Sequence, residues 1–223
     1  MRRRPALPCA LVLCGASLLT FLPAQAANLL TNGSFEGGAF VNQGNDTMSL
    51  ATGSTTITAW TVITDTTAWI GPTNPFGLSA SEGSMFLDLT NYETGAPFAG
   101  VRQTIDTVAG ATYELSFDLG SSNFWGRPDS ITASAGNASQ TFTSPPTGTN
   151  NDWTHETMQF IATGSSTTVV LQGASGVKYI GLDNADVELV SLPVPEPATG
   201  LLLVGGLALL GAARRSVKRE REK

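Results

Sequence analysis

Few residues between positions 27 and 192 can carry acid–base or nucleophilic chemistry. The region holds one histidine, His155, and no cysteine. Alternation along a strand places His155 opposite Thr154 and Glu156, so we expect a strand histidine without a partner. No serine lies in a nucleophile-elbow pattern, and the spacing of the acids singles out no carboxylate pair for hydrolysis. We therefore expect no enzyme, and an enzyme that cleaves polysaccharide with two acids is kept as an alternative.

Sugar binding is a second kind of chemistry, and it needs exposed aromatic faces beside polar partners. Trp125 and Arg127 lie in a segment flanked by glycine and proline, and Tyr92 lies in another polar stretch. We predict these three residues as ligand-binding residues. The alternative is that the loop aromatics fold back onto a sheet. Trp60 and Trp69 lie within apolar strand patterns and are predicted to be core residues.

Charge divides the chain into three parts. Residues 27–192 contain fifteen acidic residues against Arg102, Arg127 and Lys178, a net charge of −12. Residues 1–26 and 193–223 each carry a net charge of +3. The acidic middle repels phosphate backbones, so we predict no nucleic-acid partner.

The first 26 residues have the pattern of a signal peptide. A basic start is followed by an apolar stretch over residues 6–22 and by small residues that signal peptidase accepts, which predicts cleavage between Ala26 and Ala27. Both cysteines of the chain lie before this point. The exported protein is therefore predicted to lack disulfides.

The C-terminal part predicts one transmembrane helix over residues 198–213. This apolar run would rise about 24 Å, and snorkelling arginines can make up the difference from a hydrocarbon core of about 30 Å. The basic cluster at 214–223 predicts a cytoplasmic end, which places residues 27–192 on the other side of the membrane.

The order of features in the tail, residues 193–223, is that of a sorting signal. The motif at 194–197 contains Pro195, Glu196 and Pro197, and the apolar run and basic cluster follow it. The tail resembles the PEP-CTERM signal of Gram-negative bacteria, which is sometimes labelled an ice-binding protein C-terminal region. The resemblance implies export across the inner membrane, processing by an exosortase, and a place at the cell surface or in extracellular polysaccharide. It leaves open whether membrane anchoring through the helix is transient or permanent.

Residues 27–192 predict one all-β domain. Tyr113, Leu115 and Phe117 alternate with Glu114 and Ser116, which is typical of a half-buried strand. Short segments of this kind, bounded by turn residues, predict strands at 57–63, 68–71, 85–89, 100–105, 112–119, 130–135, 139–143, 154–161, 167–172 and 179–189. Their number and spacing predict a β-sandwich or jelly roll.

Five segments carry a second resemblance: 28–36 (NLLTNGSFE), 84–89 (SMFLDL), 101–105 (VRQTI), 109–118 (AGATYELSFD) and 181–187 (GLDNADV). Their order is similar to that of galactose-binding-like jelly rolls, including carbohydrate-binding modules and the choice-of-anchor group of exported proteins. The resemblance implies an opening strand at 28–36. Ala185 departs from the pattern, because many relatives pass directly from Asp-Asn to Val.

The same resemblance implies a structural Ca²⁺ that joins the first and last strands. The matching positions are Glu36 and Asp183, and oxygen ligands of this kind suit calcium. The alternative is that both residues make only turn and cap hydrogen bonds.

Together these features predict an exported, non-catalytic protein of the cell surface or extracellular matrix. The first hypothesis is a carbohydrate-binding or polysaccharide-associated module, with Trp125 and Arg127 nearest the ligand. The alternative is a structural surface protein that self-associates and binds no sugar.

Overall fold

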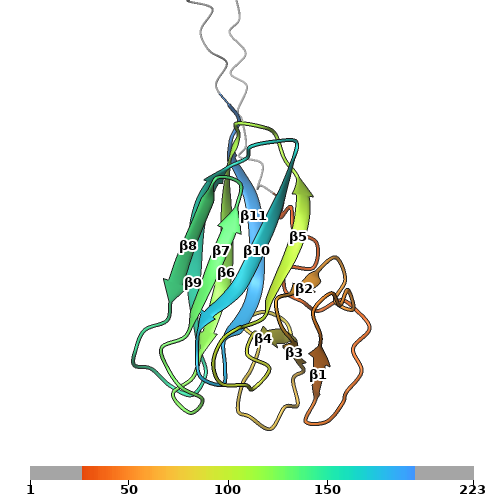
Figure 1. Ribbon diagram of the computed structural model, residues 1–223, viewed down its shortest axis with the longest axis vertical. Helices are drawn as coiled ribbons and strands as arrows, with labels where there is room; N and C mark the ends of the chain where they lie inside the picture. The colour runs from red at the N-terminus through yellow and green to blue at the C-terminus, as the bar shows by residue number, and fades with distance from the viewer. Residues whose placement is uncertain (1–26, 194–223) are drawn as a thin grey trace, which may run out of the picture.

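The computed structural model describes residues 27–193, which form two antiparallel β-sheets packed face to face (Figure 1). The strands are β1 (Thr47–Leu50), β2 (Thr61–Ile63), β3 (Thr67–Ile70), β4 (Phe86–Asp88), β5 (Gly100–Asp106), β6 (Thr112–Ser121), β7 (Ser130–Ala135), β8 (Ala138–Thr143), β9 (Asp152–Ile161), β10 (Ser166–Ser175) and β11 (Gly181–Ser191). This arrangement confirms the predicted all-β jelly-roll sandwich. The predicted signal peptide and the predicted helix at 198–213 lie outside the described residues. Within 27–193, no helix is both long and apolar enough to span a membrane.

The two sheets differ in their number of strands. One has six strands in the order β1-β3-β4-β11-β6-β9, and the other has five in the order β2-β5-β10-β7-β8. Ten of the eleven strands coincide with predicted segments, and β1 is the one that was not predicted. Leu50 is the only buried residue of β1, so the strand lacks the apolar alternation that marks the others.

The predicted strand at 57–63 is shorter in the structure. Ile57 makes only an isolated bridge with Gly38, and the regular strand begins at Thr61. Ala59 between them has φ of +68°, a left-handed conformation that a continuous strand does not contain. A turn therefore replaces the first half of the predicted segment.

Large apolar side chains from both sheets form the main core, as the alternation predicts. Trp60 and Trp69 are fully buried, which confirms their predicted place in the core. Their indole N–H groups donate to the backbone oxygens of Asn32 (2.8 Å) and Phe35 (2.9 Å). The core thus satisfies both indoles and fixes the turns at the beginning of the described chain.

The opening strand implied for residues 28–36 is not present. Residues 30–35 form bends and a turn instead, and the segment bonds to β5 through Gln103 and to β11. Asn28 bonds through its side chain to the backbone of β11, and the Gly33 carbonyl accepts the N–H of Ala185 at 2.9 Å. A Cβ on Gly33 would lie 1.8 Å from the Ala185 oxygen, so only glycine fits there.

Ala185 departs from the relatives' pattern because β11 contains a bulge. Asp183 pairs with Asp118 and Asp186 pairs with Ser116, so two residues of β11 stand opposite one residue of β6. The extra residue turns Asp186 to the outer face of the sheet.

A second, smaller apolar cluster lies on the side of β3 and β4 that faces away from the main core. Its buried members are Ala68, Ile70, Leu78, Phe86 and Tyr179. Half-buried aromatic side chains pack against it, one from β9 (Trp153) and three from neighbouring loops (Phe76, Tyr92 and Trp125). The loops that follow β3, β4, β6 and β10 therefore share one apolar base, and this base positions the candidate site.

Candidate functional site

An aromatic pocket lies where these loops converge. The ring of Phe76 is 5.3 Å from that of Tyr92 and 5.9 Å from that of Trp125, measured between centroids. With the three rings, the polar residues Asn45, Thr47 and Lys178 line a pocket of about 290 Å³. We call these six residues the aromatic pocket. The structure thus brings together Tyr92 and Trp125, two predicted ligand-binding residues from different loops.

Two polar atoms of residues that line the aromatic pocket have no partner in the described part of the chain. The Tyr92 hydroxyl and Trp125 Nε1 are buried, and neither has a hydrogen-bond partner among residues 27–193. Buried donors are normally satisfied, so these two are unusual, and a ligand would reach them only after the side chains move. Burial raises the pKa of Tyr92 to about 12, which keeps the hydroxyl protonated at neutral pH.

Asp88 positions one side of this pocket. It is fully buried, and its carboxylate accepts the N–H groups of Thr90 (2.9 Å), Tyr92 (3.2 Å) and Ile180 (3.0 Å). Burial raises the pKa of Asp88 to about 6, and these hydrogen bonds oppose the rise. One side chain thereby holds Tyr92 in its left-handed turn and fixes the loop that carries Lys178.

The loop between β6 and β7 positions Trp125. Ser122 Oγ accepts the N–H groups of Phe124 (3.1 Å) and Trp125 (3.4 Å), as in a local turn. Phe124 is 71% exposed, and its ring lies 4.7 Å from that of Trp125. The tip of the loop therefore offers a second aromatic face beside the pocket.

Arg127 does not line the aromatic pocket. Its side chain is only 3% exposed, and its guanidinium pairs with the Asp152 carboxylate. The same group donates to the backbone oxygens of Ser121 (3.3 Å) and Pro145 (3.2 Å). In this structure Arg127 joins three loops at the base of the Trp125 loop, and its position there is that of a structural residue.

Asp129, at the end of the same loop, is an unusual buried acid. It is fully buried, and neither carboxylate oxygen has a hydrogen-bond partner within 27–193. Burial raises the pKa of Asp129 to about 8, and the positive charge of Arg127 lowers it in part. The Trp125 loop therefore rests on a carboxyl group whose neutral form is favoured.

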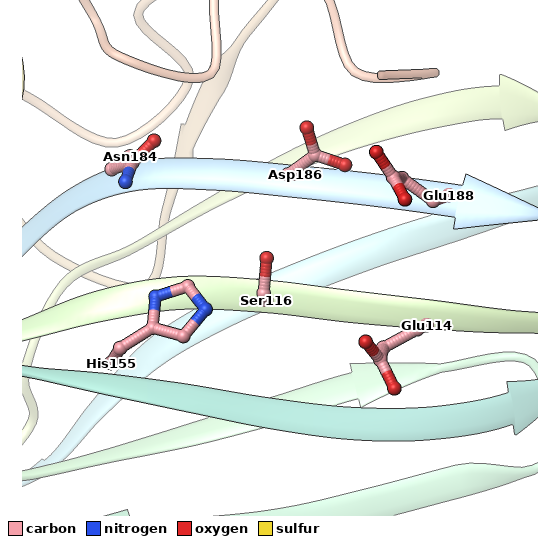
Figure 2. A pocket seen from close by; sticks show the side chains of 6 residues that line it. All are labelled: Glu114, Ser116, His155, Asn184, Asp186 and Glu188. Atoms are coloured by element: carbon pink, nitrogen blue, oxygen red, sulfur yellow. The ribbon is translucent and has the colours of Figure 1, made fainter. Parts of the chain in front are cut away.

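A second pocket lies on the outer face of the six-stranded sheet (Figure 2). It measures about 300 Å³ and is lined by Glu114, Ser116, His155, Asn184, Asp186 and Glu188, which we call the sheet-face pocket. Glu114 stands directly opposite Glu188 in the strand register, and Asp186 opposite Ser116. Like charges in such cross-strand pairs destabilise a sheet. This pocket is acidic and has no aromatic lining residue.

The expectation that His155 has no partner is wrong. His155 Nδ1 lies 2.7 Å from Asp118 Oδ1, because the register of β6 and β9 sets the two residues directly opposite. Ser81 Oγ also bonds to Asp118 and not to the imidazole. The serine is therefore not activated by the histidine, unlike the nucleophile of a Ser-His-Asp triad.

Glu36 and Asp183, the predicted calcium ligands, meet at one segment, residues 81–85. Glu36 Oε1 accepts the N–H groups of Ser84 (2.7 Å) and Met85 (2.6 Å). Asp183 Oδ2 accepts those of Ser81 (2.8 Å) and Glu82 (3.0 Å), and its Oδ1 accepts that of Asn184 (2.7 Å). Burial raises the pKa of Asp183 to about 7 against these bonds.

This arrangement of Glu36 and Asp183 fits hydrogen bonding better than metal ligation. N–H donors occupy the lone pairs that a cation would need, and an N–H group cannot itself be a ligand. Within residues 27–193, no three His, Cys, Asp or Glu side chains are grouped to hold a metal. Calcium stays a prediction of the family resemblance.

The family model described as "Protein of unknown function (DUF642)" matches residues 28–178, more than half of the chain. The chain belongs to the DUF642 family. A second match, the PEP-CTERM protein-sorting motif, covers residues 193–219 and confirms the predicted tail. This DUF642 protein is therefore exported, sorted by an exosortase, and located at the surface or outside the cell.

Other comparisons relate the DUF642 domain to larger and to smaller proteins. Halomucin of Haloquadratum walsbyi (strain DSM 16790 / HBSQ001) is 27% identical over 194 residues, which cover 84% of this chain and 2% of halomucin. The chain thus spans only a small fraction of that relative's length.

Two solved carbohydrate-binding structures are similar to the domain. TmCBM61 in complex with β-1,4-galactotriose has 17% identity and a TM-score of 0.44, over 75% of this chain and 100% of that one. The CBM22-1-CBM22-2 tandem domain of Paenibacillus barcinonensis Xyn10C has 16% identity and a TM-score of 0.44, over 76% of this chain and 48% of that one.

Proposed function

We propose that this DUF642 protein is a non-catalytic glycan-binding module of the cell surface or extracellular matrix, and that the aromatic pocket holds the sugar. One observation carries the proposal: Phe76, Tyr92 and Trp125 line a pocket whose other lining residues, Asn45, Thr47 and Lys178, are polar. Flat aromatic rings suit the C–H faces of a pyranose, and the polar tips suit its hydroxyls.

The size of the aromatic pocket indicates how much sugar it takes. Its volume of about 290 Å³ lies at the small end of ligand sites, which run from about 300 to 1,000 Å³. We infer that it receives a single or terminal sugar unit, while the exposed ring of Phe124 lies beside the path of a neighbouring unit.

The non-catalytic part of the proposal rests on the sheet-face pocket. His155, its only imidazole, is bonded to Asp118, and the nearby Ser81 is bonded to the same carboxylate. Among residues 27–193, no hydroxyl is hydrogen-bonded to this imidazole. Glu114 and Glu188 lie directly opposite each other in the register, and a two-acid enzyme that cleaves polysaccharide is therefore the alternative to test at this pocket.

Retention on polysaccharides tests the proposal. The exported protein and its Trp125→Ala and Tyr92→Phe variants would be passed over cellulose, chitin, α-glucan, mannan and galactan. We expect retention on at least one of them, lost with Trp125→Ala and weakened with Tyr92→Phe. Trp153→Phe is the matched control, because Trp153 is also half-buried but does not line the aromatic pocket.

Two results would contradict the proposal. Retention that survives Trp125→Ala would place any sugar elsewhere on the molecule. Retention on none of the five polymers, together with a mass that grows with protein concentration, would favour the alternative of a self-associating structural protein.

A further inference from the structure

The three basic residues of the domain have very different environments. Arg127 is buried in its pair with Asp152. Arg102 is exposed on β5, on the outer face of the five-stranded sheet. Lys178 is exposed and lines the aromatic pocket, and no acidic side chain within residues 27–193 forms an ion pair with it. An unpaired cation is notable in a region of fifteen acids.

The lining of the aromatic pocket contains no carboxylate. Asn45 supplies an amide beside Lys178 that can donate hydrogen bonds to an anion, whereas the Thr47 hydroxyl donates to the backbone oxygen of Gly44 at 2.9 Å. Asp46, between them in sequence, has its carboxylate bonded to the N–H (2.7 Å) and hydroxyl (2.8 Å) of Thr73. The pocket thus combines an apolar wall with a cluster of donors that includes one positive charge.

We propose that the aromatic pocket selects an acidic sugar, a pyranose that carries a carboxylate or a sulfate group. The ring would lie against the aromatic side chains, and the anionic group would meet Lys178 and the amide of Asn45. A charge-assisted hydrogen bond of this kind is about twice as strong as a neutral one. This inference rests on the proposed function of the same pocket, and adds the charge of the ligand to it.

The net charge of the domain does not exclude such a ligand. At physiological ionic strength charges are screened over about 8 Å, so remote acids contribute little at the pocket. Asp88 is nearer, because its charge helps to raise the pKa of Tyr92, and it therefore opposes Lys178 in part. The carboxylates of the sheet-face pocket come from the outer face of β6 and β11. By contrast, Lys178 acts at contact distance, so the local charge decides the selectivity.

Matched pairs of small sugars test the inference. Methyl glucoside would be compared with methyl glucuronide, methyl galactoside with methyl galacturonide, and glucose with glucose 6-sulfate. Binding would be followed through the indole N–H resonances of the exported protein, whose four tryptophans give few signals, with Trp125 assigned from Trp125→Phe. We expect the acidic member of at least one pair to bind about three- to tenfold more tightly.

Two variants separate the local charge from the total charge. Lys178→Met should remove the preference for the acidic sugar. Arg102→Met removes the same charge from the opposite sheet and should leave the preference unchanged. Lys178→Arg should retain most of it, because the charge is kept.

The outcomes distinguish this inference from the proposed function. Equal binding of neutral and acidic sugars, or an equal effect of Lys178→Met and Arg102→Met, would overturn the acidic-sugar inference alone. If no sugar of any pair moves the Trp125 resonance, both the inference and the proposed function fail. A preference for the sulfate alone, or for the carboxylates alone, identifies which anion the pocket takes.

Discussion

The sheet-face pocket and the aromatic pocket have nearly the same volume, about 300 and 290 Å³, but they are lined by different kinds of residues. Regular strands form the first, and its lining includes Glu114, Asp186 and Glu188. Loops form the second, and its lining has three aromatic rings and one lysine. An anionic group would therefore be repelled at one pocket and attracted at the other.

The two pockets also differ in what holds them. In the sheet-face pocket, ladder hydrogen bonds hold the lining residues in place whatever their charge. At the aromatic pocket, the buried carboxyls of Asp88 and Asp129 support the loops that carry Tyr92 and Trp125. We infer that the strands tolerate repulsion at their surface, whereas the loops depend on buried acids and are sensitive to pH.

The sharpest test of the comparison is a substitution in each pocket. Trp125→Ala removes the largest ring of the aromatic pocket and should weaken glycan binding by more than about 2 kcal/mol, or roughly thirtyfold. Glu188→Gln in the sheet-face pocket should change glycan binding by less than twofold. Titration of the best-retained glycan measures both, and an equal loss in the two variants would mean that the pockets do not differ in function.

The second test uses pH and Asp129. Its folded-state pKa of about 8 exceeds the ordinary value of 3.8, so unfolding releases a proton between these pH values. The stability contributed by the neutral carboxyl is therefore complete below about pH 4 and is lost as the pH rises towards 8. Asp88 and Asp183 are shifted in the same direction and should steepen the decline.

Asp129→Asn should flatten this dependence in part. An amide keeps the shape of the acid and carries no charge, so we expect a melting temperature at least about 3 °C above the wild type at pH 8, and little change at pH 4. Thermal unfolding followed by circular dichroism from pH 4 to 8 gives the comparison. A variant whose curve runs parallel to the wild type would show that Asp129 is not the titrating group.

A smaller change in stability, which comes from repulsion between two charges, is expected at the sheet-face pocket. Glu188→Gln relieves the repulsion with Glu114 and should raise the free energy of unfolding by about 0.5 kcal/mol at low salt. The gain should shrink in 1 M salt, where charges are screened over about 3 Å. Urea unfolding at both salt concentrations measures it, and destabilisation by Glu188→Gln would mean that the carboxylate has an attractive partner.

The smallest effect is expected from removal of calcium. Because N–H groups already occupy Glu36 and Asp183, we expect EDTA to shift the melting temperature by less than about 1 °C. A fall of several degrees, restored by added Ca²⁺, would instead support the metal clamp that the family resemblance implies. Glu36→Gln is the companion variant, since it weakens the hydrogen bonds to Ser84 and Met85 in either case.

The fold could be predicted further than the site. A period of two places Tyr113, Leu115 and Phe117 in the core from the sequence alone, and ten strands follow from patterns of this kind. Only β1 was not predicted, because its burial depends on contact with β3 and not on its own alternation. The irregular structure of residues 28–36 was also not predicted, because tertiary hydrogen bonds fix it.

The aromatic pocket was predicted in part. Trp125 and Tyr92 stood out as aromatic residues in polar loops, but nothing local indicated that Phe76 and Lys178 would join them. That convergence depends on four loops that meet on one apolar base. Arg127 was predicted to bind the ligand, but it pairs with Asp152 instead. The sequence around Arg127 could not indicate this pairing, because the whole β7–β8 hairpin lies between the two residues.

The length of β11 sets the distance between the aromatic pocket and the C-terminal end of the domain. β11 runs from Gly181, close to the loop of Lys178, to Ser191, next to the sorting motif that begins at residue 193 (Figure 1). At about 3.3 Å per residue, these eleven residues span roughly 35 Å. The strand is therefore a stiff spacer, and whatever holds the protein by its C-terminal end keeps the aromatic pocket at the opposite tip, where a polymer strand can reach it from outside.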